Sequence, residues 1–173
     1  DGMIVILKSD VADFKMRMFN LDGSEGKMCG NGIRCFCKFV YDYHLTDKTY
    51  LEVETLAGIK KAWLKVENGK VIRVKVDMGE PIINTKDIPC LFDKDKMINE
   101  AVEIDNNTYY LTSVSMGNPH TVMYVDSLDF DISIIGKKIE KHSLFPESVN
   151  TEFVVIIDRN HLKMRVWERG SGE

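Results

Sequence analysis

The chain has 173 residues, of which 44% are hydrophobic, so it is long enough to bury one sizeable core or two small ones. Its 23 Lys and Arg against 27 Asp and Glu give a formal net charge of -4, with no basic block. Nucleic acids and anionic membranes bind clustered positive charge, so we expect neither partner and favour a small polar ligand.

The apolar runs and the cysteines indicate a soluble cytoplasmic protein. No apolar run approaches the roughly 18 residues of a membrane helix, and the start lacks a basic-then-apolar signal layout. The cysteines are Cys29, Cys35, Cys37 and Cys90, three of them within one short segment. That spacing suits neither a disulfide framework nor a zinc site, so we expect reduced thiols and no metal.

The first half of the chain predicts several strands and one helix. "FKMRMF" at 14–19 alternates apolar with charged residues, which is the period of a half-buried strand. Asn68-Gly69 is a strong signal for a two-residue hairpin turn. The strands of this half are predicted at 3–8, 14–19, 49–55, 59–67 and 71–77. We expect the last three of them to be antiparallel.

A helix over 32–43 is predicted because its apolar residues recur at helical spacing. These residues are Ile33, Phe36, Phe39, Val40 and Tyr43. The helix begins just after Cys29, whereas Cys35 and Cys37 lie within it. Because residues two apart point in different directions, these two thiols cannot both face one site, and we assign them to packing.

The connector "MGEPIINTKDIP" predicts a domain boundary near 78–81. The first domain then covers 1–78 and the second covers 79–173. The second domain carries one predicted helix, at roughly 132–141. Its strands are predicted at 109–115, 120–125, 151–158 and 162–168.

Two segments echo one another. "DFKMRMFNLDGSEGKMCGNG" near the start and "HLKMRVWERGSGE" at the end share a Lys-Met-Arg strand, a polar residue at its end (Asn20 or Glu168), and a turn of Gly, Ser and Glu. If this is a duplication, the sequence stops shortly before the second copy would carry its own cysteine and helix. We therefore expect the chain to be part of a longer protein.

Cys29 stands directly before Gly-Asn-Gly and the start of a helix. A helix N-terminus stabilises thiolates and binds anions, and Gly30 and Gly32 let a ligand approach the backbone. A thiol beside a carboxylate cradle could remove a proton from the carbon that bears the carboxylate. Taken alone, the segment favours a small buried cysteine over a catalytic one, because free cysteine is among the residues most often buried.

Further polar residues lie near predicted strand ends and loops, where sites are commonly assembled. They are Asn118 and His120 in "SMGNPHTV", Asn150 in "SVNTEF", and Glu168 and Arg169 in "WERGSGE". Each has an ordinary alternative: the asparagines as turn residues, the histidine as a loop cap, and the last two as a solvated ion pair. Only their joint presence with Cys29 favours a site.

Four ordered motifs, "MCGNGIRC", "MGNPHTV", "VN" before a strand and "ERGSGE", together resemble the diaminopimelate epimerase family. The resemblance implies an α+β fold of two similar domains, each a curved, largely antiparallel sheet wrapped around a central helix. It implies a cofactor-independent isomerase, without pyridoxal phosphate or metal, that converts LL- to meso-diaminopimelate for lysine and peptidoglycan synthesis. One cysteine thiolate removes the α-proton, and an opposite thiol protonates the other face.

Carried over by motif, the resemblance implies that Cys29 is the first catalytic cysteine and that His120 and Glu168 tune the two thiols. The substrate ligands that it implies are Asn20, Gly30, Asn31, Asn118, Asn150, Glu168 and Arg169. The family also has an earlier Gly-Asn-Asp-Phe segment and a later second cysteine with its helix, which are not in this sequence.

We therefore expect a fragment, incomplete at both ends, that is inactive by itself. Without its central helix, the second domain should expose an apolar sheet face. A partner, another copy of the chain in a homodimer, or further chain would have to cover this face.

Two other functions stay open. A proline racemase-like isomerase of the same fold would act on proline, hydroxyproline or another small acid, although Glu168 and Arg169 favour the extra polar anchoring that diaminopimelate needs. A non-catalytic amino-acid-binding module would keep the carboxylate cradle without an activated Cys29. A zinc site formed by the first three cysteines and His44 has the wrong spacing.

Overall fold

The computed structural model describes residues 2–20 and 23–173. The chain forms two compact units, unit 1 (Asp1–Gly79) and unit 2 (Glu80–Glu173). Each unit has its own sheet and its own hydrophobic core. Within the described ranges, no helix is long and apolar enough to cross a membrane.

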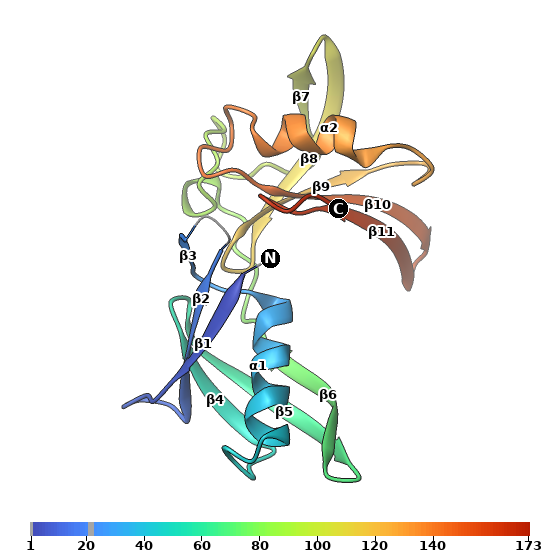
Figure 1. The fold of residues 1–173 in the computed structure, drawn as a ribbon. Coiled ribbons are helices and arrows are strands. Elements are labelled where there is room, and N and C mark those ends of the chain that lie inside the picture. Colours follow the sequence, from blue (N-terminus) through green and yellow to red (C-terminus); the bar gives the residue numbers. More distant parts are fainter. Residues whose placement is uncertain (1, 21–22) are drawn as a thin grey trace. The chain divides into compact units, whose positions relative to one another are not determined.

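Unit 1 is a sheet with one helix on it (Figure 1). The sheet has the order β1-β2-β4-β5-β6, with the short β3 paired to β2. Its strands are β1 (Met3–Leu7), β2 (Phe14–Phe19), β3 (Glu25–Gly26), β4 (Tyr50–Thr55), β5 (Gly58–Glu67) and β6 (Lys70–Asp77). Neighbours are antiparallel except β2 and β4, which are parallel. The five strands predicted here are confirmed, and so is the antiparallel order of the last three.

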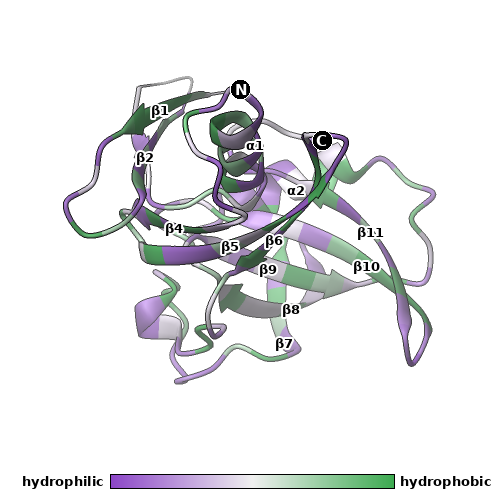
Figure 2. Cartoon of the chain, turned by 90° about the horizontal axis from the view of Figure 1, so that it is seen from below, coloured by the Kyte–Doolittle hydropathy of each residue, from purple (hydrophilic) through white to green (hydrophobic). Residues whose placement is uncertain are grey.

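The helix of unit 1, α1 (Gly30–Asp42), packs against β1, β2, β5 and β6. Its buried side chains are those of Ile33, Phe36, Cys37 and Val40. The strands complete the core with residues such as Met16 and Leu51. Figure 2 shows the hydrophobic residues of β1, and Ile4 and Ile6 of this strand pack against the same core.

The helix begins at Gly30, directly after Cys29 as predicted, two residues before the apolar pattern that indicated it. Two other details of the predicted helix were wrong. Phe39 and Tyr43 do not join the buried stripe: they are exposed and stack on each other with ring centroids 4.3 Å apart. Cys35 is exposed rather than packed, because it faces away from the buried side that Cys37 occupies.

Unit 2 is a five-stranded sheet of order β11-β10-β9-β8-β7. Its strands are β7 (Glu100–Ile104), β8 (Asn107–Ser115), β9 (Pro119–Tyr124), β10 (Asn150–Asp158) and β11 (His161–Trp167). β9 and β10 are parallel, and the other neighbours are antiparallel. β7 was not predicted, but the other four strands are confirmed. A short 3-10 helix, η1 (Thr85–Asp87), precedes the sheet.

The second helix, α2 (Ile132–Glu140), lies across β10 and β11 as Figure 1 shows, and it confirms the prediction for this region. Its buried isoleucines pack with Phe153 and Trp167 in the core of unit 2. Gly136 allows the close approach of Trp167, since a Cβ at Gly136 would lie 2.5 Å from the indole ring. This contact fixes the end of β11.

The echo between the two ends of the chain is a structural repeat, in which each residue of the second copy is numbered 148 higher than its counterpart. Val5 pairs with Arg17 in the first hairpin, and Phe153 pairs with Arg165 in the second. The guanidinium of Arg17 donates two hydrogen bonds to Glu25, at 2.7 and 2.8 Å. Arg165 donates the same two bonds to Glu173, at 2.6 and 2.5 Å.

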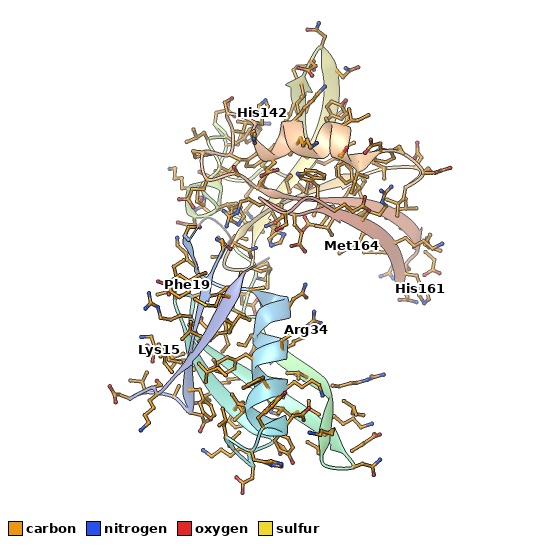
Figure 3. The ribbon with its side chains drawn as sticks, in the orientation of Figure 1. Lys15, Phe19, Arg34, His142, His161 and Met164 are labelled. Carbon is orange, nitrogen blue, oxygen red and sulfur yellow. The ribbon has the colours of Figure 1, made fainter. Side chains whose placement is uncertain are left out.

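The two copies differ in what covers them. Met16 of β2 is 3% exposed beneath α1, whereas its counterpart Met164 of β11 is 58% exposed. Ile156 and Leu162 are opposite each other in the β10–β11 pair, on the same side as Met164, and both are also exposed. Figure 3 labels Met164 on this hairpin, with His161 near its tip. The exposed apolar sheet face predicted for the second half is confirmed.

Candidate active site

Cys29 is the residue that caps the N-terminus of α1. Its backbone is extended, with φ -138° and ψ 112°, and its sulfur accepts a hydrogen bond from the Gly32 N–H at 3.2 Å. A hydrogen bond of this kind is stronger to a thiolate than to a thiol. The side chain is partly exposed, and its thiol is free. The cap therefore holds a nucleophilic or basic sulfur in place without burying it.

Gly32 packs directly against this cysteine. A Cβ at Gly32 would lie 3.2 Å from both the Cβ and the sulfur of Cys29, and 3.0 Å from the Cδ1 of Ile4. At Gly30, the nearest atom would be the Cε of Met78 at 3.7 Å, an ordinary contact. Gly32 thus provides the space that the sulfur occupies, whereas the predicted role of Gly30 beside a bound carboxylate stays a prediction.

Asn20 and Asn31 lie at the end of β2 and in the first turn of α1. Asn20 donates from Nδ2 to the hydroxyl of Ser24 at 3.0 Å, and from its backbone N–H to the Ser24 carbonyl at 2.8 Å. Asn31 accepts a hydrogen bond from Arg34, which Figure 3 labels on α1. In unit 1, Asn20 thus follows the end of β2, and Cys29 and Asn31 lie at the start of α1.

In unit 2 the predicted residues lie at one end of the sheet. β9 and β10 begin next to each other, with His120 opposite Asn150, and β11 ends beside them, with Trp167 opposite Thr151. Asn118 is half-buried in the loop before β9. Glu168 is exposed and Arg169 is half-buried in the turn after β11.

Asn150 ties these segments together. Its Oδ1 accepts from the Arg169 backbone N–H at 2.9 Å, and its Nδ2 donates to the Pro119 carbonyl at 3.0 Å. The residue is only 8% exposed. In this arrangement the side chain of Asn150 positions the backbone of Pro119 and the backbone of Arg169. The predicted contact between its amide and a substrate stays a prediction.

The turn that carries Glu168 and Arg169 is anchored by a buried carboxylate that the sequence did not point to. Glu140 accepts from the indole N–H of Trp167 at 2.8 Å through Oε2, and from the Gly170 N–H at 3.0 Å through Oε1. These two donors flank the turn residues on both sides. The signal in the sequence that could have indicated Glu140 is its position directly after Ile139, which is buried in α2.

Glu168 and Arg169 in this turn make two further hydrogen bonds. The Arg169 guanidinium donates to the Glu147 carbonyl at 2.9 Å. The backbone N–H of Glu168 donates to the Gly172 carbonyl at 2.7 Å, as Asn20 does to Ser24 in the first copy of the repeat.

His120 lies within hydrogen-bond distance of Glu152, a second carboxylate that the sequence analysis missed.

Solved structures define the class of this fold. A hydroxyproline epimerase from Agrobacterium vitis with bound trans-4-hydroxy-L-proline matches with a TM-score of 0.73 at 14% identity, over 99% of this chain and 54% of that one. A probable proline racemase from Agrobacterium radiobacter K84 matches with a TM-score of 0.70 at 12% identity, over the same shares. The fold is thus the two-unit α+β fold of racemases and epimerases, with two mixed, largely antiparallel sheets.

The sequence comparisons identify the family within this class. The model of the diaminopimelate epimerase family matches residues 1–83 and 112–173. Diaminopimelate epimerases from Methanococcus maripaludis strain S2 and Acetivibrio thermocellus are each 56% identical over 100% of this chain. The chain belongs to the diaminopimelate epimerase family. It spans 63% and 62% of the lengths of these two relatives.

Proposed function

We propose that the protein carrying this chain interconverts LL- and meso-diaminopimelate, and that Cys29 is one of its two acid–base thiols. The observation that carries the proposal is the capped sulfur of Cys29, which is partly exposed and held at 3.2 Å from the Gly32 N–H. Membership of the family supports the choice of substrate. The reaction would belong to lysine and peptidoglycan precursor synthesis in the cytoplasm.

In this mechanism the thiolate of Cys29 removes the α-proton from one face of the substrate. The C–H bond breaks, the proton goes to sulfur, and the electron pair delocalises into the neighbouring carboxylate. The second thiol of the protein then gives its proton to the opposite face, so the two sulfurs exchange protonation states. The unpaired N–H groups at the start of α1 would stabilise the charge that develops on the carboxylate. Such a reaction needs no cofactor or metal.

The polar residues of unit 2 take the supporting roles in this proposal. Arg169 would bind a substrate carboxylate, for which a guanidinium has matching geometry. Asn118 and Asn150 would bind remaining amino-acid groups, a role that we also propose for Asn20 of unit 1. His120 and Glu168 would move protons to and from the thiols. A homodimer stays a prediction, which light scattering on the whole protein tests.

The proposal is tested by incubating the whole protein that carries this chain with LL-diaminopimelate in D₂O and following loss of the α-hydrogen by NMR and the stereoisomers by chiral chromatography. Replacing a general acid–base residue typically costs 10² to 10⁴ in rate, so we expect Cys29→Ser to lower turnover by about 10³-fold. Cys35→Ser is the matched control, since Cys35 is an exposed thiol on the same helix. It should keep the wild-type rate.

Two results would overturn the proposal. Turnover of L-proline or trans-4-hydroxy-L-proline in place of diaminopimelate would favour a proline racemase-like isomerase. Tight binding of diaminopimelate without exchange of its α-hydrogen would favour a binding module.

A further inference from the structure

His120 shares a short hydrogen bond with a carboxylate on the neighbouring strand. Its Nδ1 lies 2.6 Å from the Oε1 of Glu152, and the two side chains are 25% and 13% exposed. In the parallel β9–β10 pair His120 is opposite Asn150, so Glu152 lies two residues further along β10 and on the same side of the sheet. An ionised carboxylate only accepts hydrogen bonds, so a hydrogen bond from His120 to ionised Glu152 requires a proton on the ring nitrogen that faces it.

Glu152 stands where the other copy of the repeat has an aliphatic residue. Its counterpart is Ile4, which pairs with Met18 as Glu152 pairs with Val166. Ile4 packs against the core of unit 1, and its Cδ1 lies next to Gly32 at the start of α1. The copy in unit 2 therefore has a carboxylate at a position that serves packing in unit 1.

Burial makes this carboxylate costly. The Oε2 of Glu152 is buried and has no hydrogen-bond partner among the residues that the structure describes. Burying part of a charged group without a partner is unfavourable, and good hydrogen bonds to its other atoms offset the cost only in part. The other oxygen of Glu152, Oε1, bonds to His120. Glu152 therefore provides a hydrogen bond to an imidazole where Ile4 of unit 1 provides an aliphatic contact.

We propose that Glu152 is a positioning residue that fixes the tautomer of His120, with the proton on Nδ1 and Nε2 free to exchange protons with a reacting thiol. A hydrogen bond at one ring nitrogen of histidine decides which nitrogen is protonated, and a carboxylate at Nδ1 leaves Nε2 as the base. The inference rests on the proposed function, in which His120 serves one of the two cysteines.

The tautomer can be measured without any turnover, by NMR of the protein labelled with ¹⁵N in its histidine side chains. The chain has four histidines, and His120→Gln identifies the signals of His120. In the neutral ring we expect a protonated Nδ1 and an unprotonated Nε2. Glu152→Leu should shift the ring to the other tautomer or to a mixture of both. The same single tautomer in the wild type and in Glu152→Leu would overturn the proposal.

A second histidine–carboxylate pair provides the matched control. His161 lies 2.9 Å from both carboxylate oxygens of Asp158 at the exposed β10–β11 turn. Asp158→Asn should change the signals of His161 and leave those of His120 unchanged.

The catalytic consequence is a second readout. Loss of a correctly oriented base typically costs on the order of 10²-fold or more, so Glu152→Leu should lower kcat by that factor while KM changes little. Glu152→Gln keeps an oxygen acceptor at the same distance and should recover part of the rate, and it serves as the test variant if Glu152→Leu does not fold. Full kcat in both variants would sink the proposal even if the wild type turns over diaminopimelate. A wild type without turnover would refute the proposed function, and the NMR result would still decide the tautomer.

Discussion

The Oδ1 of Asn150 accepts a hydrogen bond from the backbone N–H of Arg169 at 2.9 Å. Because the same amide donates to the Pro119 carbonyl, one buried side chain holds the start of β9 and the turn after β11 together. The polar groups of unit 2 are thus fixed by side-chain hydrogen bonds as well as by strand pairing. Glu140 shares this work, because it accepts hydrogen bonds from Trp167 and Gly170 on either side of Glu168 and Arg169.

Asn150→Ala should destabilise unit 2, because it leaves the partly buried N–H of Arg169 and the buried carbonyl of Pro119 without partners. A buried polar group left unsatisfied costs about 1–3 kcal/mol. We would measure urea unfolding by the fluorescence of Trp167, in a Trp63→Phe background so that the signal reports on unit 2. The exposed amide of Asn107 offers a control, and Asn107→Ala should stay within about 0.5 kcal/mol of the parent. Equal midpoints for the two alanine variants would contradict the structural role of Asn150.

Gly32→Ala should slow the alkylation of Cys29 by iodoacetamide. A Cβ at Gly32 would displace the sulfur from its cap, and loss of one hydrogen bond of about 1 kcal/mol corresponds to roughly a fivefold change in rate. Gly30→Ala, where the Cβ has room, should leave the rate unchanged. Peptide mass spectrometry separates the thiols: Cys35 should react in every variant, and burial raises the pKa of Cys37 to about 12, so it should stay unmodified. A Gly32→Ala rate equal to that of Gly30→Ala would refute this account of the cap.

Asp42 makes the attachment of α1 to β6 sensitive to acid. It accepts from Lys38 Nζ at 2.7 Å and from the Val71 N–H at 2.8 Å, and the hydrogen bonds from Lys38 and then from Val71 lower the pKa of this carboxyl. A carboxyl with a lowered pKa in the folded state stabilises above its unfolded pKa of about 3.9, and this contribution is lost as the pH falls through the folded pKa. Unit 1 should therefore lose stability on acidification below about pH 4.

Asp42→Asn should be less stable than the wild type at pH 7 and should depend less on pH across this window. Urea unfolding at pH 3, 4 and 7 measures the effect, with the exposed Asp47→Asn as the control. Parallel pH profiles for the wild type and Asp42→Asn would contradict the assignment.

Met16 and Met164 occupy the same place in the two copies of the repeat but differ in burial, at 3% and 58% exposure. Met16→Lys would bury an unpaired ammonium beneath α1 and should unfold or severely destabilise unit 1, by more than about 3 kcal/mol. In the 173-residue chain by itself, Met164→Lys should stay within about 0.5 kcal/mol of the wild type, as exposed substitutions do. Thermal unfolding compares the two variants. A large loss in Met164→Lys would show that this side of β11 is covered in solution, and light scattering would then tell whether another copy covers it.

The strands with regular alternation could be predicted from the sequence alone. "FKMRMF" and "HLKMRVW" carry the same pattern, and both form strands at the predicted places. The two parallel pairings, β2 with β4 and β9 with β10, could not be predicted, because no local pattern relates segments that are far apart in the chain. β7 was missed because the alternation of "EAVEI" is short and its two glutamates resemble loop residues.

The candidate site was predicted only in part. Cys29 was singled out by its glycines and by the helix that follows, and the structure places it as the cap of that helix. Glu140 and Glu152 were missed because glutamates are usually solvent-exposed, and their partners Trp167 and His120 come from other elements of the fold. Burial of a carboxylate becomes visible only when the tertiary contacts are known.

The central claim is that Cys29 acts at the α-carbon of diaminopimelate, and covalent trapping tests it most directly. An aziridine analogue of diaminopimelate carries a ring that a thiolate opens by forming a C–S bond, and its two epimers present that ring to opposite faces. We predict that one epimer modifies Cys29 once, as mapped by peptide mass spectrometry, and that excess meso-diaminopimelate prevents the reaction. If neither epimer modifies Cys29 in a protein that turns over diaminopimelate, or if Cys35 alone is modified, the account is wrong.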